Sequence, residues 1–179
     1  MWQFNLIVTL AAEGRFQPLW MELMQHGDFR KTEFFGVIAG RIDDPPAFFE
    51  FVSEKRDHQS LIYLDIGRIV PLDRCLTFSP DTFEERIREA LVPYIDRLDG
   101  QRFYVRIERR GLKGRIVSPE VERELDEFLQ QELIQRQGSA QIDFDNPDLI
   151  VAIETLGTRC GIGLISRELL QCYDFVRVP

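Results

Sequence analysis

This chain has few residues of the types that bind metal ions or form disulfide bonds. Its 179 residues include 3 cysteines and 2 histidines. The cysteines, Cys75, Cys160 and Cys172, show no CxxC spacing, which argues against a zinc ribbon and a disulfide framework and favours reduced thiols in the cytoplasm. His26 and His58 have no second ligand at the spacing of HxxxH or HExxH, so the sequence predicts no metal site.

Long apolar runs and common catalytic motifs are also missing. No uninterrupted apolar run approaches the roughly 18 to 20 residues that span a bilayer, and the first five residues lack the basic region of a signal peptide. We find no GxSxG, no phosphate-binding GxxxxGK followed by Ser or Thr, and no GxGxxG between a strand and a helix. The sequence therefore predicts a cytoplasmic protein without a membrane segment, and it indicates no catalytic residue and no cofactor.

The hydrophobic pattern predicts a mixture of strands and helices in the first half. Hydrophobic residues make up 44% of the chain and charged residues 29%, as in an ordinary folded domain. We expect strands at residues 4–10, 33–42 and 61–70, and helices from about Phe16 to Gly27 and from Pro45 onward. The order strand, helix, strand, helix, strand indicates an α/β or α+β module of about 70 residues.

The second half contains the same helix-start motif twice. Ser79-Pro80 and Ser118-Pro119 each place a serine at the N-cap and a proline at the first helical position. Further strands are expected at residues 103–108, 149–155 and 161–166. In the first of these, alternation predicts that Phe103, Val105 and Ile107 point inward and that Tyr104, Arg106 and Glu108 point outward. We place the boundary between the halves within residues 72–79.

Positive charge is concentrated in one short segment of an acidic chain. The chain has 22 basic and 30 acidic residues, a net charge of -8. Residues 102–115 carry a net +5, which leaves -13 for the rest, and their six basic side chains are Arg102, Arg106, Arg109, Arg110, Lys113 and Arg115. Arginine forks suit phosphate, Gly111 and Gly114 let a ligand approach the backbone, and the helix from Ser118 adds free N–H groups. We therefore expect an anion-binding corner that can hold a polyanion.

Other interpretations of these charged and aromatic residues are structural. The arginines can instead pair with acidic helix residues such as Glu120, Glu122 or Glu124. A solvated helix face accounts for Asp81, Glu84, Glu85 and Glu89. The run Phe48-Phe49-Glu50-Phe51 offers rings on which nucleobases can stack, but its helical spacing favours a place in the core.

Four segments of the second half stand in a distinctive order. They are FYVRIERRG at residues 103–111, the helix opened by Ser118, IDFDNPDLIVAIE at residues 142–154 and CGIGLIS at residues 160–166. Together they resemble the THUMP domain, an RNA-binding module, over residues 75–179, and Asn146-Pro147-Asp148 is the most specific part. Residues 1–74, with FNLIV near the start and IVPLDRCLTF at the boundary, are similar to the ferredoxin-like domain that precedes THUMP in such proteins. The implied fold is α+β, a ferredoxin-like domain followed by a THUMP domain.

This resemblance implies binding of tRNA, typically near its acceptor end, with the chemistry supplied by another polypeptide. The chain is most similar to stand-alone THUMP proteins, whose best-known members are adaptors of tRNA cytidine N4-acetylation. The implied protein is not an enzyme, the six basic residues of segment 102–115 contact the RNA, and the partners are tRNA and a tRNA-modifying enzyme. The overall acidity departs from the usual RNA-binding pattern.

Two other functional interpretations stay open at this point. In one, the chain is a protein-interaction module whose acidic surface docks a partner enzyme, and that enzyme supplies most RNA contacts. In the other, the chain is itself an enzyme, which the lack of a nucleophile–base pair or a metal cluster in the sequence disfavours.

Overall fold

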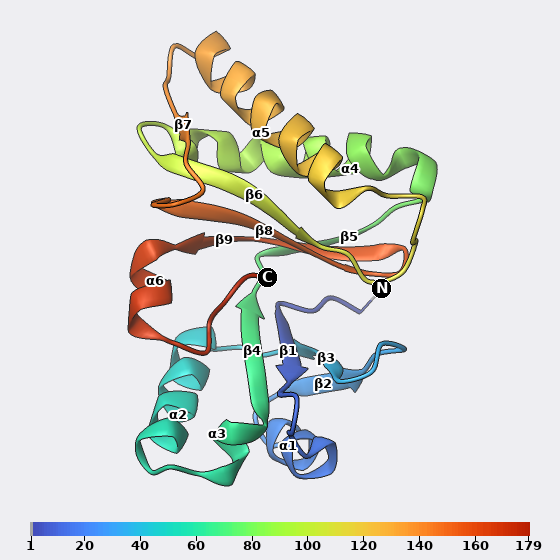
Figure 1. The fold of residues 1–179 in the computed structure, drawn as a ribbon, viewed down its shortest axis with the longest axis vertical. Coiled ribbons are helices and arrows are strands. Elements are labelled where there is room, and N and C mark those ends of the chain that lie inside the picture. The colour runs from blue at the N-terminus through green and yellow to red at the C-terminus, as the bar shows by residue number, and fades with distance from the viewer. Residues whose placement is uncertain (1) are drawn as a thin grey trace.

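The computed structural model describes residues 2–179, and these residues form two β-sheets that follow one another along the chain (Figure 1). The described residues place four strands in the first sheet, in the order β2-β3-β1-β4, and five in the second, in the order β5-β9-β8-β6-β7. Helices cover the outer face of each sheet, and the inner faces meet (Figure 1). The expected α+β fold is confirmed.

The first half runs β-α-β-β-α-β, with one short extra helix before the last strand. Its elements are β1 (Leu6–Leu10), α1 (Phe16–Leu23), β2 (Asp28–Lys31), β3 (Val37–Arg41), α2 (Pro45–Asp57), α3 (Leu61–Asp65) and β4 (Ile66–Pro71). All strand pairs in this sheet are antiparallel, which is the split β-α-β arrangement. The helix expected from Pro45 is present, and it buries Phe48 and Phe49 in the core, as its helical spacing favoured.

Two strand predictions in this half are wrong. The strand expected at residues 61–70 begins only at Ile66, because Leu61–Asp65 forms α3, whose N-cap Ser60 accepts a hydrogen bond from the Ile62 N–H. A short apolar run fits a helix and a strand equally well, so the local cap decides. The strand expected at residues 33–42 is present as β3 but begins only at Val37, because residues 32–36 form the turn of a hairpin. The first strand of that hairpin, β2, was not expected, since it is charged and mostly exposed and shows no apolar pattern.

The second half adds a five-stranded sheet with helices on its outer face. Its elements are β5 (Arg74–Thr77), a 3-10 turn (Pro80–Thr82), α4 (Phe83–Leu91), a 3-10 segment (Val92–Leu98), β6 (Arg102–Glu108), α5 (Ser118–Gln135), β7 (Gln141–Ile142), β8 (Leu149–Leu156), β9 (Arg159–Ser166) and α6 (Arg167–Cys172). Strand β6 is parallel to β8, and β9 is antiparallel to β8 and β5. The sequence indicated neither the short strands β5 and β7 nor α6.

The structure confirms the N-cap expected at Ser79 but not the one expected at Ser118. Ser79 is an N-cap: its backbone N–H donates to the Thr82 hydroxyl at 3.0 Å, and Pro80 opens the turn. Ser118 is not the N-cap of α5, because Val117 occupies that position and no side chain caps the helix. The prediction was thus wrong by one residue at the second start.

Strand β6 is buried on both faces. Phe103, Val105 and Ile107 pack with α4 and α5 in one core, as expected. Tyr104, expected to point outward, is 7% exposed and lies in a second core shared with the first half. That prediction was wrong because alternation alone does not show that another sheet covers the outer face.

The C-terminal residues complete the first sheet. The Ile69 N–H of β4 donates to the Phe175 carbonyl at 2.7 Å, and Phe175 and Val176 are buried in the core of the first half. The chain passes from the first sheet to the second between Pro71 and Arg74 and then returns at its C-terminal end. The two halves therefore share a core, and C-terminal residues lie beside β4 at the edge of the first sheet.

Candidate functional site

The six basic side chains of segment 102–115 do not gather in one place. Arg102 begins β6, whereas the loop with the last four follows Glu108 at its other end, about 20 Å away at strand spacing. The Arg102 guanidinium donates to both carboxylate oxygens of Asp148, at 3.0 Å and 2.9 Å. Arg102 therefore fixes a turn of the fold and lies away from the loop.

The Asn146-Pro147-Asp148 turn is held by two arginines. Besides Arg102, Arg167 donates to the carbonyls of Asn146 and Pro147 and lies 3.1 Å from the Asp148 carboxylate. The hydrogen bonds from Arg102 lower the pKa of Asp148 to about 2. The most specific part of the sequence resemblance thus has a structural role, since it joins the start of β8 to the starts of β6 and α6.

Replacing Asp148 by Asn should destabilise the protein more at neutral than at acid pH. The folded pKa of Asp148, about 2, lies below the unfolded value of about 3.9, so its contribution is complete above about pH 5 and is lost as the pH falls toward 2. Urea unfolding should show a smaller difference in the free energy of unfolding between wild type and Asp148→Asn at about pH 3 than at about pH 7. Asp145→Asn, in the same loop, is the control and should show little change at either pH. A gap of equal size at both pH values would contradict the assigned ion pair.

Arg106 is also engaged within the fold. Its guanidinium lies 3.8 Å from Glu122 of α5 and 5.5 Å from the centre of the Tyr104 ring. For this residue the ion-pair interpretation, which named Glu122 among the partners, is confirmed.

Arg110 is buried in an ion pair. It is 8% exposed and pairs with Glu154 of β8, which is 1% exposed. Burial raises the pKa of the Glu154 carboxyl, and the Arg110 guanidinium opposes that rise. Arg110 also lies 4.0 Å from Glu108, which pairs at 3.1 Å with Arg68 of β4. This chain of charges joins the two halves, so Arg110 is not free to bind a ligand.

The remaining three basic residues lie on the loop between β6 and α5. Arg109 donates to the Gly111 carbonyl, and Lys113 is exposed; within residues 2–179 neither has a carboxylate partner. Arg115 is 59% exposed and pairs at 3.0 Å with the exposed Asp81. Gly111 and Gly114 have φ values of +87° and +78°, which favour glycine. Three of the six basic residues therefore lie together on this loop, and anion binding by them stays a prediction.

The loop packs against parts of both halves. A Cβ on Gly111 would lie 3.2 Å from the Gly157 Cα of the β8–β9 turn and 3.4 Å from the Phe34 ring of the β2–β3 hairpin. Figure 1 shows these three segments on the same side of the molecule, at the right of the view. A groove of about 280 Å³ lies beside them and is lined by Trp2, Arg30, Lys31, Thr32, Glu33, Phe34, Ala39, Leu156 and Arg159.

Two arginines flank an aromatic ring in this groove. The Arg30 guanidinium lies 4.4 Å from the centre of the Trp2 ring, and the Arg159 guanidinium lies 5.7 Å from it. Sequence reasoning missed these residues, because β2 was not expected and Arg159 meets Trp2 only through tertiary contacts. We call the surface formed by Arg30, Lys31, Arg109, Lys113, Arg115 and Arg159 the basic edge.

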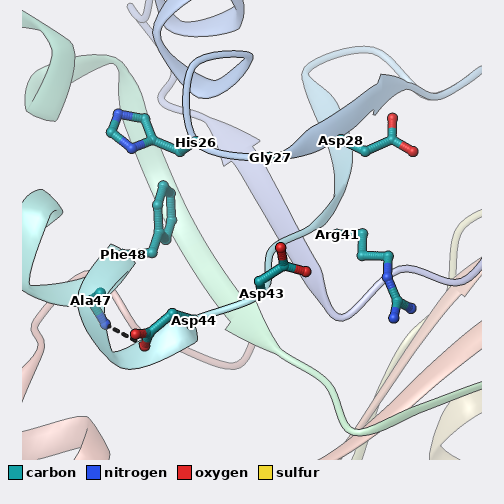
Figure 2. Close-up of a pocket in the computed structure, with 8 residues that line it drawn as sticks. All are labelled: His26, Gly27, Asp28, Arg41, Asp43, Asp44, Ala47 and Phe48. Carbon is teal, nitrogen blue, oxygen red and sulfur yellow. Dashed lines mark hydrogen bonds between the residues drawn. The ribbon is translucent and has the colours of Figure 1, made fainter.

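A second polar pocket lies in the first half (Figure 2). It has a volume of about 410 Å³ and is lined by His26, Gly27, Asp28, Arg41, Asp43, Asp44, Ala47 and Phe48. Asp44 accepts a hydrogen bond from the Ala47 N–H and caps α2, as Figure 2 shows, and Asp28 accepts from Trp2 and Arg30. Two of its carboxylates thus support the fold.

Two other kinds of feature are absent from residues 2–179. No group of three or more His, Cys, Asp or Glu side chains is placed to hold a metal ion. In the same part of the chain, no helix has the length and apolar character needed to cross a bilayer.

Comparisons with known proteins bear on the second half most directly. Residues 79–165 match the model of the THUMP domain. A tRNA sulfurtransferase from Citrobacter koseri is 43% identical over 74 residues, which are 41% of this chain and 14% of that protein.

Solved structures share the fold over most of this chain. TrmN from Thermus thermophilus matches with a TM-score of 0.61 at 17% identity, over 89% of this chain and 44% of that one. A 4-thiouridine synthetase, solved in complex with RNA and with bound ATP, matches with a TM-score of 0.57 at 15% identity, over 92% and 41%. The chain thus spans a small part of the sulfurtransferase and less than half of either solved structure.

Proposed function

Because residues 79–165 of this chain form a THUMP domain, we propose that the chain binds tRNA along its basic edge and presents it to a separate tRNA-modifying enzyme. The observation that carries this proposal is the basic edge itself, where cations from both halves meet around one loop and one groove. A sulfurtransferase named for tRNA and a synthetase solved with RNA are among the similar proteins, which supports an RNA ligand.

The three loop cations of the basic edge are available to phosphate, whereas Arg30 is paired with Asp28 at 3.1 Å. Arg109 and Lys113 have no carboxylate partner within residues 2–179, and the exposed Arg115–Asp81 pair is worth only about 0 to 1 kcal/mol. Phosphate can therefore replace Asp81 at low cost. The net charge of -13 outside residues 102–115 repels RNA from other surfaces and steers it toward this edge.

The groove adds a feature that suits unpaired nucleotides. Trp2 and Phe34 supply aromatic rings, and Arg30 and Arg159 supply cations beside Trp2. Lys31 also lines the groove, with its ammonium 5.1 Å from the centres of two rings of α1. Single-stranded RNA is bound by the same combination, with bases on aromatic faces and phosphates on basic side chains. The acceptor end of tRNA, which ends in unpaired nucleotides, fits this surface.

The proposal assigns the chemistry to another polypeptide. The similar proteins named for tRNA sulfur transfer and 4-thiouridine synthesis are much longer than this chain, which spans 14% and 41% of them. The three free thiols, Cys75, Cys160 and Cys172, are compatible with the cytoplasmic location that forms part of the proposal.

Mass spectrometry of tRNA nucleosides tests the adaptor role. A strain lacking the gene should lose one modified nucleoside, and the wild-type gene should restore it. The purified chain alone should not form that nucleoside on unmodified tRNA, because the chemistry requires the partner enzyme. An unchanged nucleoside profile in the deletion strain would contradict a role in modification, and turnover by the chain alone would contradict the non-catalytic role.

The protein-interaction alternative draws on a different surface. An open, mostly acidic pocket lies between α4, the 3-10 elements on either side of it and α5. It is lined by Asp81, Glu84, Glu85, Arg88, Glu89, Val92 and Phe128. A hydrogen bond with Glu84 raises the pKa of Glu124 on the neighbouring helix, as expected for crowded acids. Feeble tRNA binding by the chain alone, made tight by a co-purifying enzyme, would favour this alternative.

A further inference from the structure

The outer edge of β6 is closed by side chains of α5. Strand β7 pairs only with Arg102 and Phe103, so beyond them β6 has no neighbouring strand on this side. The Val105 N–H donates to Asp126 Oδ1 at 2.7 Å, and the Ile107 N–H donates to Glu122 Oε1 at 2.7 Å. Carboxylates of α5 thus satisfy backbone groups that another strand would otherwise bind.

A narrow slot opens beside these carboxylates. Its volume is about 230 Å³, and it is lined by Pro119, Glu122, Arg123, Asp126, Glu127, Ile142 and Phe144. Phe144 is 62% exposed, with its ring centre 5.3 Å from that of Tyr104. The slot is smaller than the roughly 300 to 1,000 Å³ of typical small-molecule pockets, and its size suits one long side chain. None of its residues lines the groove of the basic edge.

The charge of the slot is negative. Glu122, Asp126 and Glu127 line it, against Arg123 as the one cation among its lining residues and Arg106, 3.8 Å from Glu122, behind them. Asp126 is 2% exposed, and within residues 2–179 it has no ion-pair partner. Burying a carboxylate without a cation is unfavourable, so a cation that enters the slot gains an unusually strong partner.

We propose that this slot binds an arginine side chain of a partner protein. The alkyl stem of arginine matches Ile142 and Pro119, and its planar guanidinium can lie on the exposed Phe144 ring while donating to the carboxylates. Arginine is a frequent anchor in protein interfaces, where such pockets receive it. RNA is the poorer occupant, because its phosphates are repelled by three acidic side chains. This docking does not depend on tRNA binding at the basic edge.

An NMR titration of the full-length chain with arginine amide tests the proposal. The backbone amides of Val105, Ile107 and Ile142 should shift along one saturating curve. Citrulline amide, which has nearly the same shape and the same α-amino group but an uncharged side chain, should bind at least about tenfold more weakly, since the ion pairs of the guanidinium supply the selectivity. A citrulline amide that binds as well as arginine amide would overturn the proposal.

Two variants and a control locate the site. Asp126→Asn keeps an oxygen for the Val105 N–H, so the closed edge should persist, and it should weaken arginine amide binding about tenfold. Phe144→Ala, at an exposed ring, should also weaken it. Glu132→Gln, on the same helix but outside the slot, should bind as wild type does. Equal binding by wild type and Asp126→Asn, or a single-stranded oligonucleotide shifting the same amides more strongly, would overturn the assignment.

The pH dependence of arginine amide binding tests separately whether the Asp126 carboxylate takes part. Burial raises the pKa of Asp126 to about 7; Glu122 and Glu127 add to the rise, while Arg106 and the Val105 N–H oppose it. Arginine amide binding should therefore weaken about tenfold from about pH 8 to about pH 6 in wild type, and less in Asp126→Asn. Binding that is independent of pH in wild type would contradict the role of Asp126.

Discussion

Reversing two charges of the basic loop, Arg109→Glu with Lys113→Glu, should lower the affinity for tRNA about 100-fold near physiological salt. Each cation that neutralises a phosphate contributes through the release of counterions, and each glutamate adds repulsion. The fold should be unaffected, because within residues 2–179 neither side chain has a carboxylate partner and Lys113 is exposed. Filter binding with unmodified tRNA measures the loss, and thermal unfolding checks the fold.

The matched control carries the same change of charge elsewhere. Arg86 and Arg97 are 48% and 59% exposed, and they lie outside the basic edge. The variant Arg86→Glu with Arg97→Glu should bind tRNA within about twofold of wild type. Equal losses in the two variants would mean that total charge decides binding and that the loop does not.

Removing Arg110 should destabilise the fold by about 3 to 5 kcal/mol, the usual cost of leaving one partner of a buried ion pair alone. In Arg110→Met, Glu154 would be left without its closest cation at a position that is 1% exposed. Urea unfolding at neutral pH should show this loss. Arg110 belongs to the segment predicted to bind RNA, but it is buried in the ion pair with Glu154. Weak tRNA binding by an Arg110 variant would therefore reflect loss of folded protein and not loss of an RNA contact.

A variant that removes both members of the buried pair tests whether the lost stability comes from the unpaired carboxyl of Glu154. Arg110→Met with Glu154→Leu removes both charges and should regain most of the lost stability, since apolar replacements of a buried pair are often tolerated. Arg115→Met, which breaks the exposed pair with Asp81, should change the free energy of unfolding by about 1 kcal/mol or less. A double variant less stable than Arg110→Met alone would contradict this account of the pair.

Local signals in the sequence predicted much of the second half. The Ser79-Pro80 start, the alternation of β6 and the apolar runs of β8 and β9 each depend on a few neighbouring residues. The order of these segments was also enough to indicate the domain that the family model matches at residues 79–165.

Features set by distant contacts were not predictable in this way. Tyr104 is buried because the first half covers its face of the sheet. The C-terminal residues Phe175 and Val176 complete the first sheet, which no local pattern indicated.

In the basic segment 102–115, the sequence predicted where positive charge lies but not which of its side chains are paired within the fold. Segregation of charge correctly pointed to a basic loop, and Arg109, Lys113 and Arg115 lie on it. Sequence spacing did not reveal that Arg102 and Arg110 meet Asp148 and Glu154, because β8 brings those acids beside β6 only after folding. The groove residues of the first half were hidden for the same reason.

The salt dependence of tRNA affinity tests the central claim most directly. Filter binding of wild type and of the Arg109→Glu, Lys113→Glu variant, from about 50 to about 200 mM salt, should give linear plots of log affinity against log salt. The account predicts a steep slope for wild type and a slope shallower by about two for the variant, one unit for each lost phosphate contact. Equal slopes for the two proteins, or a wild-type affinity that does not change with salt, would contradict the basic edge as the tRNA-binding surface.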